Sequence, residues 1–273
     1  MGYIEEMFGL ENVRAVVTGG AGVIPGAMAE ALVRAGARVA IWGRGVGHPV
    51  GDAVKALTDR TGATDSVVGV TVDTGSETSV EAAYAETEEK LGAPNLLVNG
   101  VGGNRGKGPF VDLDIKSFME ILDLNVLAGL VIPTKVFARH WIEQKISASI
   151  INLASMSSYV PLSGVWAYDA AKAAVLNLTM ATAKEFAPHG IRVNGIAPGF
   201  FLGHQNKALL VKDEASGALT DRGAAVIAHT PFARFGEYGD IKGATLFLAS
   251  PAASGFVTGV TIPVDGGYLI NNI

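Results

Sequence analysis

The sequence predicts one α/β domain built on a seven-stranded parallel sheet with helices on both faces. Short β-branched runs alternate with alanine-rich stretches along the 273 residues, which is the pattern of repeated strand–helix units. The strand runs are almost continuously apolar, as is typical of strands buried on both faces. No linker, repeat or shift in composition divides the chain, so a single domain accounts for its length.

Each element follows from a local signal. The predicted strands are RAVVTG, RVAIW, SVVGVTV, NLLVNG, SIINLA, IRVNGIA and VTIPVDG. Several helical stretches between them end in glycine, as at Gly36, Gly92 and Gly190, because glycine adopts the left-handed C-terminal cap most readily. Residues 200–236 break the alternation after the sixth strand, where a doubly wound fold places its substrate-covering loop. We therefore predict a single-domain Rossmann fold over residues 1–273, with a lid at about 200–236.

Composition and charge exclude several classes of protein. The formal net charge is -5, so the basic surface that binds nucleic acid is missing. The absence of cysteine excludes disulfides, zinc–thiolate sites and thiol catalysis. The histidines form no HExxH pair and the acidic residues show no calcium-loop spacing, so we expect no metal site.

The sequence indicates a cytoplasmic protein that binds no membrane. Glu5 and Glu6 lie where a signal peptide would carry positive charge. The longest apolar stretch, from Ile121 to Ala138, is interrupted by charged residues and a proline. We interpret it as a buried helix rather than a membrane span.

The stretch VVTGGAGVIPGAMAEAL, from Val16 to Leu32, joins the first strand to a helix. Gly19, Gly20 and Gly22 allow the backbone to approach a pyrophosphate, and the helix N-terminus adds a partial positive charge. A simple tight turn would use the same residues, so this motif by itself leaves the function open.

Tyr168 and Lys172, in AYDAAK, are four residues apart and share a helix face. A free tyrosine has a pKa of about 10, and a nearby ammonium lowers it by stabilising the phenolate. A shift of roughly 2–3 units would suit this tyrosine to proton transfer near neutral pH. The same spacing also arises by chance in exposed helices, so its meaning depends on the surrounding motifs.

Further motifs surround this pair in a fixed order. Ser155 follows the strand in INLASMSS, Asn125 lies in LDLNVLAG, Asn99 ends the strand in LLVNGVGG, and RVNGIAPGF and VTGVTIPVDGG come later. With these motifs the chain resembles the short-chain dehydrogenase/reductase family over essentially its whole length. The resemblance implies an NAD(P)-dependent oxidoreductase that acts on a carbonyl or a secondary alcohol.

The resemblance also implies a role for each member of a catalytic tetrad. Tyr168 would be the general acid/base that protonates the carbonyl oxygen, and Ser155 would hydrogen-bond that oxygen. Lys172 would lower the tyrosine pKa and hold the nicotinamide ribose. Asn125 would fix a water that connects Lys172 to solvent.

The cofactor contacts are implied in the same way. Asp73 matches the position that binds the adenine amino group, Gly199 lies where the chain passes the nicotinamide, and Asn99 with Gly100 lines the far side of the pocket. The complete implied set is Thr18, Gly19, Gly20, Gly22, Val23, Ile24, Arg44, Asp73, Thr74, Asn99, Gly100, Tyr168, Lys172, Pro198 and Gly199.

The glycine-rich turn departs from the family pattern. The second and third glycines of the family fall on Val23 and Pro25, with Gly22 one residue early and Gly26 one residue late. Proline is tolerated in the first turn of a helix, where its missing N–H would be unpaired anyway. We therefore expect a modified but working turn.

The end of the second strand predicts the cofactor preference. Gly43 takes the place of the acidic residue that accepts from the ribose 2′-hydroxyl in NAD-preferring members, and Arg44 follows it. An arginine there can pair with a 2′-phosphate. We predict a preference for NADP, with NAD as the alternative.

Amide and cationic side chains in two loops predict a sugar-acid substrate, since arginine binds carboxylates in a bidentate manner. The motifs NLASMSSYVPL, PGFFLGHQNKALL and HTPFARFGE resemble the branch of the family that interconverts D-fructuronate and D-mannonate. The candidate substrate-binding residues are Asn104, Arg105, Gln205, Asn206 and Arg222.

Two alternative functions stay open. A gluconate 5-dehydrogenase or another keto-sugar or polyol reductase would use the same machinery, whereas a cofactor-binding sensor would not turn over. Members of the family usually form tetramers through two long helices, here around Phe118–Ile142 and Tyr168–Phe186. The resemblance thus implies a homotetramer.

Overall fold

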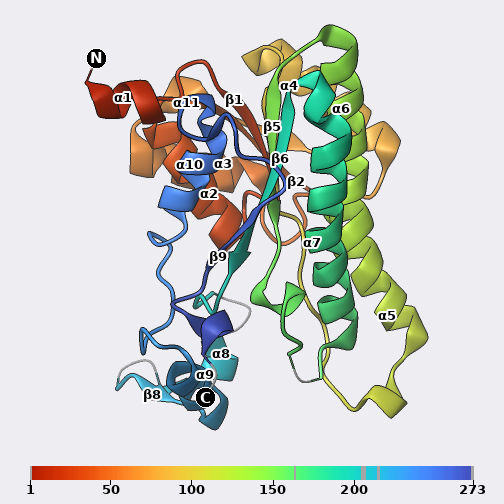
Figure 1. Cartoon of the computed structure of the whole chain (residues 1–273), viewed down its shortest axis with the longest axis vertical. Coiled ribbons are helices and arrows are strands. Elements are labelled where there is room, and N and C mark those ends of the chain that lie inside the picture. Colours follow the sequence, from red (N-terminus) through yellow and green to blue (C-terminus); the bar gives the residue numbers. More distant parts are fainter. Residues whose placement is uncertain (1, 163, 204–206, 214–215, 272–273) are drawn as a thin grey trace.

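The sheet has the predicted composition and direction. The computed structural model describes residues 2–162, 164–203, 207–213 and 216–271, and Figure 1 shows its arrangement. Seven parallel strands lie in the order β3-β2-β1-β4-β5-β6-β9, which confirms the Rossmann fold. β1 and β4 are neighbours at the point where the strand order reverses, the position at which such folds bind ligands. The strands are β1 (Arg14–Thr18), β2 (Arg38–Gly43), β3 (Val67–Thr71), β4 (Leu96–Asn99), β5 (Ala148–Leu153), β6 (Ile191–Pro198) and β9 (Thr261–Val264).

Helices cover both faces of the sheet, as predicted (Figure 1). One face carries α2 (Val23–Arg34), α3 (Val50–Thr61) and α10 (Lys242–Ala249), and the other carries α4 (Glu77–Leu91), α6 (Ile132–Gln144) and α7 (Trp166–Phe186). Further helical segments are α1 (Tyr3–Phe8), α5 (Ile115–Leu122), α8 (Lys207–Leu210), α9 (Asp221–His229), α11 (Pro251–Ser254), η1 (Thr64–Ser66), η2 (Phe110–Asp112), η4 (Met156–Ser158), η5 (Ala187–His189) and η6 (Tyr268–Ile270).

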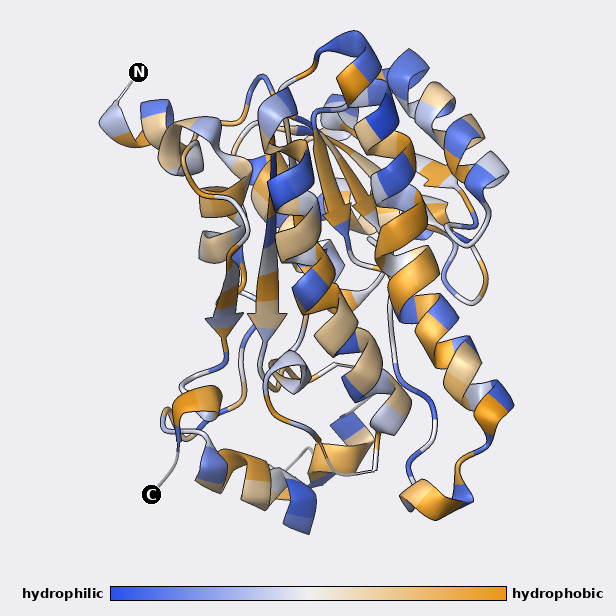
Figure 2. Cartoon of the chain, turned by 45° about the vertical axis from the view of Figure 1, so that its right-hand side comes forward, coloured by the Kyte–Doolittle hydropathy of each residue, from blue (hydrophilic) through white to orange (hydrophobic). Residues whose placement is uncertain are grey.

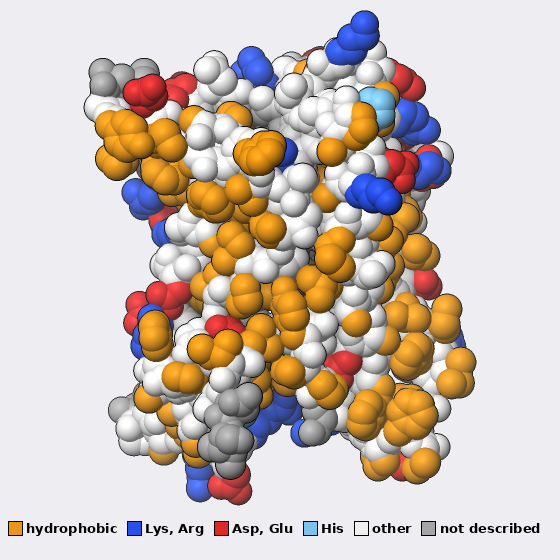
Figure 3. Space-filling model, in the orientation of Figure 1, with side chains coloured by type: hydrophobic (Ala, Val, Ile, Leu, Met, Phe, Trp, Pro, Cys, Tyr) orange, Lys and Arg blue, Asp and Glu red, His pale blue; other side chains and the backbone are white. Residues whose placement is uncertain are grey.

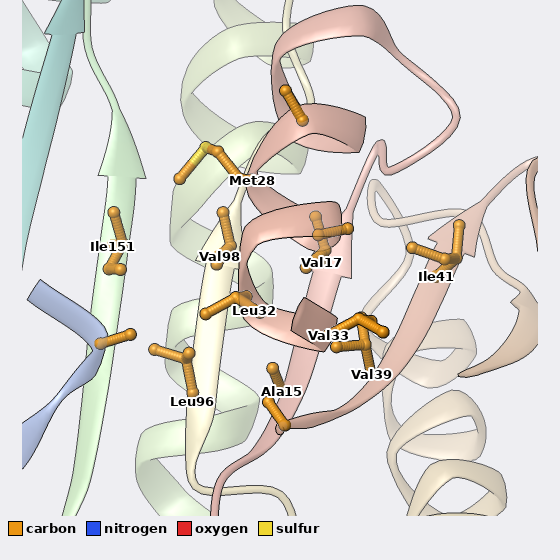
Figure 4. Packing of buried hydrophobic residues seen from close by; sticks show 14 of the residues in the cluster. Ala15, Val17, Met28, Leu32, Val33, Val39, Ile41, Leu96, Val98 and Ile151 are labelled. Atoms are coloured by element: carbon orange, nitrogen blue, oxygen red, sulfur yellow. The ribbon is translucent and has the colours of Figure 1, made fainter. Parts of the chain in front are cut away.

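The core consists of a hydrophobic layer on each side of the sheet. Successive side chains of a strand point to opposite faces, so Val17 packs with Met28 and Leu32 of α2, as Figure 4 shows. Val16 points the other way and belongs to the layer that contains Phe137 of α6. Burial on both faces explains why these strands are apolar throughout.

A π-helix interrupts the long helix predicted around Asn125. α5 runs into η3 (Asp123–Val131), which has π-helical bonding, and η3 runs into α6. Pro133 lies in the first turn of α6. Proline lacks an N–H and clashes with the carbonyl four residues earlier, so regular α-helical bonding cannot continue through this position.

The continuous helix Ile115–Gln144 is long and apolar enough to cross a membrane by length and composition. Its most apolar window has a mean hydropathy of 1.6, and 50% of that window is buried inside the protein. Buried core helices meet the same criterion, so the helix is weak evidence for a membrane span.

The described residues of the Phe200–Gly236 segment lie beyond the carboxyl ends of the strands (Figure 2). It contains α8, α9 and a small hairpin that the sequence did not predict, formed by β7 (Val211–Asp213) and β8 (Ala218–Leu219). The backbone N–H of Gly236 donates to the carbonyl oxygen of Phe200 at 2.8 Å. The two ends of the segment are therefore joined at its base.

Candidate active site

The fold brings the four predicted catalytic residues together at the carboxyl end of the sheet. Ser155 follows β5, Tyr168 and Lys172 lie in the first turns of α7, and Asn125 lies in η3. The Ser155 side chain is close enough to the Tyr168 phenol to lower its pKa, and Lys172 Nζ is 5.6 Å from the centroid of the tyrosine ring. A Cβ built on Gly102 would be 2.7 Å from Asn125 Oδ1 and 3.4 Å from Lys172 Nζ, so these two groups flank the same point of the backbone.

Burial controls the protonation of Tyr168 and Lys172. The Lys172 side chain is buried, and burial lowers its pKa to about 8. Its Nζ donates to the carbonyl oxygen of Leu153 at 2.7 Å. Burial also raises the pKa of Tyr168, against the hydrogen bond to Ser155 that lowers it and together with the charge of Asp169 that raises it. The direction differs from the predicted lowering because desolvation outweighs the nearby groups.

The Ser155 hydroxyl is held in place by the turn that follows β5. Its Oγ accepts from the backbone N–H of Ser157 at 3.1 Å. Ser158, which sequence reasoning missed, donates its hydroxyl to the carbonyl oxygen of Lys172 at 2.7 Å. The serine turn is thus attached to the helix that carries Tyr168, which fixes the separation of the two catalytic hydroxyls.

Asn125 holds the glycine-rich loop after β4. Its Oδ1 accepts from Gly103 N at 3.0 Å, and its Nδ2 donates to Gly103 O at 2.8 Å and to Ile121 O at 2.9 Å. Both amide hydrogens are therefore used by protein acceptors. A water fixed by Asn125, as predicted, would have to use the second lone pair of Oδ1 or the backbone carbonyl.

The turn after β1 has the shape of an anion-binding cradle. Gly19 has a φ of 63°, which favours glycine, and Gly22 is the residue that caps α2. The N–H of Gly22 donates to Gly19 O, and the N–H of Gly26 closes the first helical bond to Gly22 O, each at 2.8 Å. The N–H groups of Val23 and Ile24 lie in the first turn, where α-helices leave donors unpaired for an anion. These residues fit a dinucleotide pyrophosphate.

Pro25, a departure from the family pattern, meets Gly100 in space. Pro25 is the third residue of α2, so its missing N–H removes no helical hydrogen bond. A Cβ on Gly100 would lie 2.8 Å from Pro25 Cγ and 2.5 Å from Thr18 O. The glycine at position 100 therefore makes the room that the proline ring occupies.

Two of the predicted cofactor residues use their side chains to hold strands together. Thr18 Oγ1 donates to Val98 O at 3.2 Å and accepts from Gly100 N at 2.9 Å. Asn99 Nδ2 donates to Thr134 Oγ1 at 2.9 Å and to Asn152 Oδ1 at 2.8 Å. Sequence reasoning missed Thr134 and Asn152, although an asparagine inside a buried strand, as in SIINLA, is a signal for such a network.

The remaining cofactor candidates lie along the same edge of the sheet. Asp73 is exposed after β3, and its Oδ1 accepts from Gly75 N at 3.0 Å, while Thr74 is buried. Arg44 is exposed directly after β2. At the end of β6 the structure places Pro198 and Gly199, and a Cβ on Gly199 would come within 2.6 Å of Asp265 Cα.

A cleft of about 730 Å³ lies beside this constellation. Arg44, Asn104, Arg105 and Lys107 all line it, as does the segment from Gly164 to Ala167 that leads directly into Tyr168. Three cations from two loops therefore share one cleft with the residues that precede the catalytic tyrosine.

Of the other substrate candidates, Arg222 does not line this cleft. Arg222 lies on α9 of the Phe200–Gly236 segment, close enough to Tyr268 for its charge to lower the pKa of that phenol against the larger effect of burial. Gln205 and Asn206 fall outside the described residues. Among the residues that the structure describes, no cluster of three His, Cys, Asp or Glu could hold a metal ion.

Known proteins resemble this chain over nearly its full length. The sequence model of a family described as Enoyl-(Acyl carrier protein) reductase matches residues 20–269. An uncharacterized oxidoreductase UxuB from Bacillus subtilis (strain 168) is 41% identical over 274 residues, which cover 95% of this chain and 96% of that protein.

Two solved structures extend the comparison. A Haemophilus influenza protein, provisionally assigned as a D-mannonate oxidoreductase and solved with bound NAD, is 32% identical with a TM-score of 0.87 over 98% of this chain and 99% of its own. A gluconate 5-dehydrogenase from Burkholderia cenocepacia J2315, in complex with NADP and tartrate, is 30% identical with a TM-score of 0.86 over 99% of this chain and 100% of its own. Together with the family match, these similarities show that the chain belongs to the short-chain dehydrogenase/reductase family of NAD(P)-dependent oxidoreductases.

Proposed function

We propose that this oxidoreductase interconverts a ketouronate-type sugar acid and its secondary alcohol, with D-fructuronate and D-mannonate as the natural pair. The observation that carries the proposal is the cleft in which Arg105 and Lys107 lie beside the segment leading into Tyr168. A guanidinium in such a place suits a carboxylate. The D-mannonate assignment of one solved relative and the tartrate bound to another support an acidic, hydroxylated substrate.

The tetrad supplies the proton chemistry of this reaction. Reduction adds a hydride to the carbonyl carbon and a proton to its oxygen, and the nicotinamide cofactor supplies the hydride when it is bound. Tyr168 donates the proton, and Ser155 hydrogen-bonds the carbonyl oxygen and orients it. Lys172 holds the ribose and, through Asn125, connects to the water that returns a proton to the tyrosine.

We infer that NADP is the preferred cofactor. Gly43 carries no side chain to accept from a ribose hydroxyl, and the exposed Arg44 beside it is free to pair with a 2′-phosphate. The solved relatives contain NAD in one case and NADP in the other. The ratio of kcat/KM for the two cofactors tests this inference, and a preference for NADH would overturn it.

The direct test of the function uses purified protein with D-fructuronate and each reduced cofactor, and with D-mannonate in the reverse direction. We expect turnover in both directions, and Arg105→Gln to raise the KM for the sugar acid about tenfold, the effect of losing one charged hydrogen bond. Arg139→Gln, which breaks an ion pair with Glu81 between α6 and α4 and does not line the cleft, is the control. Turnover of uncharged keto-sugars alone, with Arg105→Gln unchanged, would favour the polyol or gluconate 5-dehydrogenase alternative.

We further propose that the Phe200–Gly236 segment is the substrate lid, with Arg222, Gln205 and Asn206 completing the site.

We also propose that the protein is a cytoplasmic homotetramer. Figure 3 shows apolar side chains gathered over α5. Met119, Leu127 and Met180 on the helices expected to form the interface are 49%, 44% and 47% exposed. Light scattering of the purified protein tests the assembly, and a monomer at micromolar concentration would contradict it.

A further inference from the structure

The loop that carries the predicted substrate-binding cation is tied to the catalytic helix by Trp166. The indole Nε1 of Trp166 donates to the carbonyl oxygen of Gly108 at 3.0 Å. The N–H of Gly108 in turn donates to the carbonyl oxygen of Gly164 at 3.2 Å. Trp166 is the first residue of α7, two positions before Tyr168, so the loop and the catalytic hydroxyl share one anchor.

Packing reinforces these two hydrogen bonds. The ring of Phe110 meets the indole of Trp166 edge-on, with centroids 5.6 Å apart and planes at 85°. Gly164 has a φ of 79°, and a Cβ there would lie 2.8 Å from Lys107 Cγ, so the lysine stem lies against the glycine backbone. The residues on either side of Gly108 therefore both contact the segment before Tyr168: Lys107 packs against Gly164 and Phe110 packs against Trp166.

The loop has few other constraints in the part of the chain that the structure describes. Asn104 bonds within the loop, from Nδ2 to Gly106 O at 3.2 Å, and the hydrogen bonds that join residues 104–108 to other described residues end on Gly164 and Trp166. Gly106 and Gly108 have no described atom within 4 Å of an added Cβ. A loop with two such glycines would sample many conformations without an anchor.

We propose that Trp166 is a positioning residue for substrate selection, which holds Arg105 at a set distance from Tyr168. The carboxylate of the sugar acid then binds the loop while its carbonyl meets the catalytic hydroxyl, because pre-ordering a binding loop lowers the entropy lost on binding. This inference rests on the proposed function for its substrate, but the anchoring of the loop does not.

Trp166→Phe tests the proposal, since it keeps an aromatic ring beside Phe110 while it removes the N–H donor and part of the indole ring. We expect the KM for D-fructuronate to rise about tenfold, the loss expected for one hydrogen bond, with the cofactor KM and the melting temperature unchanged. Trp141→Phe is the matched control, because Trp141 Nε1 also donates to a backbone carbonyl, that of Pro94 at 2.6 Å, but lies in the core. That variant should lower the melting temperature and leave the KM unchanged.

Limited trypsin digestion tests the anchor without any substrate. Arg105 and Lys107 are cleavage sites within the loop, and Trp166→Phe should speed cleavage there while Trp141→Phe should not. An unchanged cleavage rate would overturn the anchor, and faster cleavage with an unchanged KM would overturn its role in substrate selection. If the wild-type protein does not turn over the sugar acid, the proposed function fails, and the digestion alone decides the anchor.

Discussion

The cofactor side and the substrate side of the active site are built in opposite ways. On the cofactor side, backbone segments touch: a Cβ on Gly100 or Gly199 would lie 2.5 Å or 2.6 Å from backbone atoms of Thr18 or Asp265. On the substrate side, a Cβ added to Gly106 or Gly108 would have no described atom within 4 Å. Steric contact thus restricts the residues of the first side to a few types, whereas Gly108 on the second side has room for a larger side chain.

Tyr168 lies between the two sides, and its loss should have the largest effect. Tyr168→Phe removes the proton donor and keeps the ring, so we expect turnover to fall by roughly 10³, within the range for a general acid, while cofactor binding persists. Single-turnover rates and cofactor titration measure the two. A variant that keeps wild-type turnover would remove this tyrosine from the mechanism.

Lys172 should make stability depend on pH. In the unfolded chain it holds its proton up to about pH 10.5, whereas in the folded chain its pKa is about 8. Between these values the unfolded state binds more protons, so the free energy of unfolding rises with pH, by about 3 kcal/mol over the full window.

Lys172→Met should remove this dependence. Urea unfolding at several pH values between about 8 and 10 compares the two proteins, a range below the raised pKa of Tyr168. We expect the slope of the wild-type stability against pH to exceed that of the variant. Parallel curves would show that the lysine is not desolvated.

Gly100→Ala tests the close packing of the cofactor side. The new methyl group would clash with Thr18 O and with the Pro25 ring, so we expect a loss of about 2 kcal/mol in stability from overpacking and weaker cofactor binding. Gly108→Ala, on the open side, should change stability by less than about 0.5 kcal/mol. Adding Pro25→Ala removes the clash with the proline ring but not the clash with Thr18 O, so it should restore only part of the lost stability. Equal effects at both glycines would contradict the contrast between the sides.

Gly102→Ala should have a smaller effect than the changes at Tyr168, Lys172 and Gly100. Its methyl group would push on Asn125 Oδ1 at 2.7 Å, whereas at Gly103 the nearest atom is Leu124 Cδ2 at 4.0 Å. We expect kcat to fall about tenfold, or 1.4 kcal/mol, with the cofactor KM unchanged. Gly103→Ala is the control. A fall in melting temperature without a fall in kcat would show that the contact is only structural.

The sequence predicted the strands that carry the active site, but not the hairpin within the Phe200–Gly236 segment. The sequence indicated all seven strands and the positions of Ser155, Tyr168 and Lys172, because strand burial and helical spacing act over a few residues. It did not show that Asn125 holds Gly103, nor that Asn99 bonds Thr134 and Asn152, since these partners are far apart along the chain.

By itself, then, the sequence determined the fold class, the family and the order of the chemical groups, because each of these depends on local periodicity or on motifs that steric contact restricts. The tertiary structure decided what no local pattern contains. It placed Pro25 against Gly100, it buried Lys172 so that its pKa falls to about 8, and it attached the Arg105 loop to Trp166. Each of these depends on distances between segments that only folding brings together.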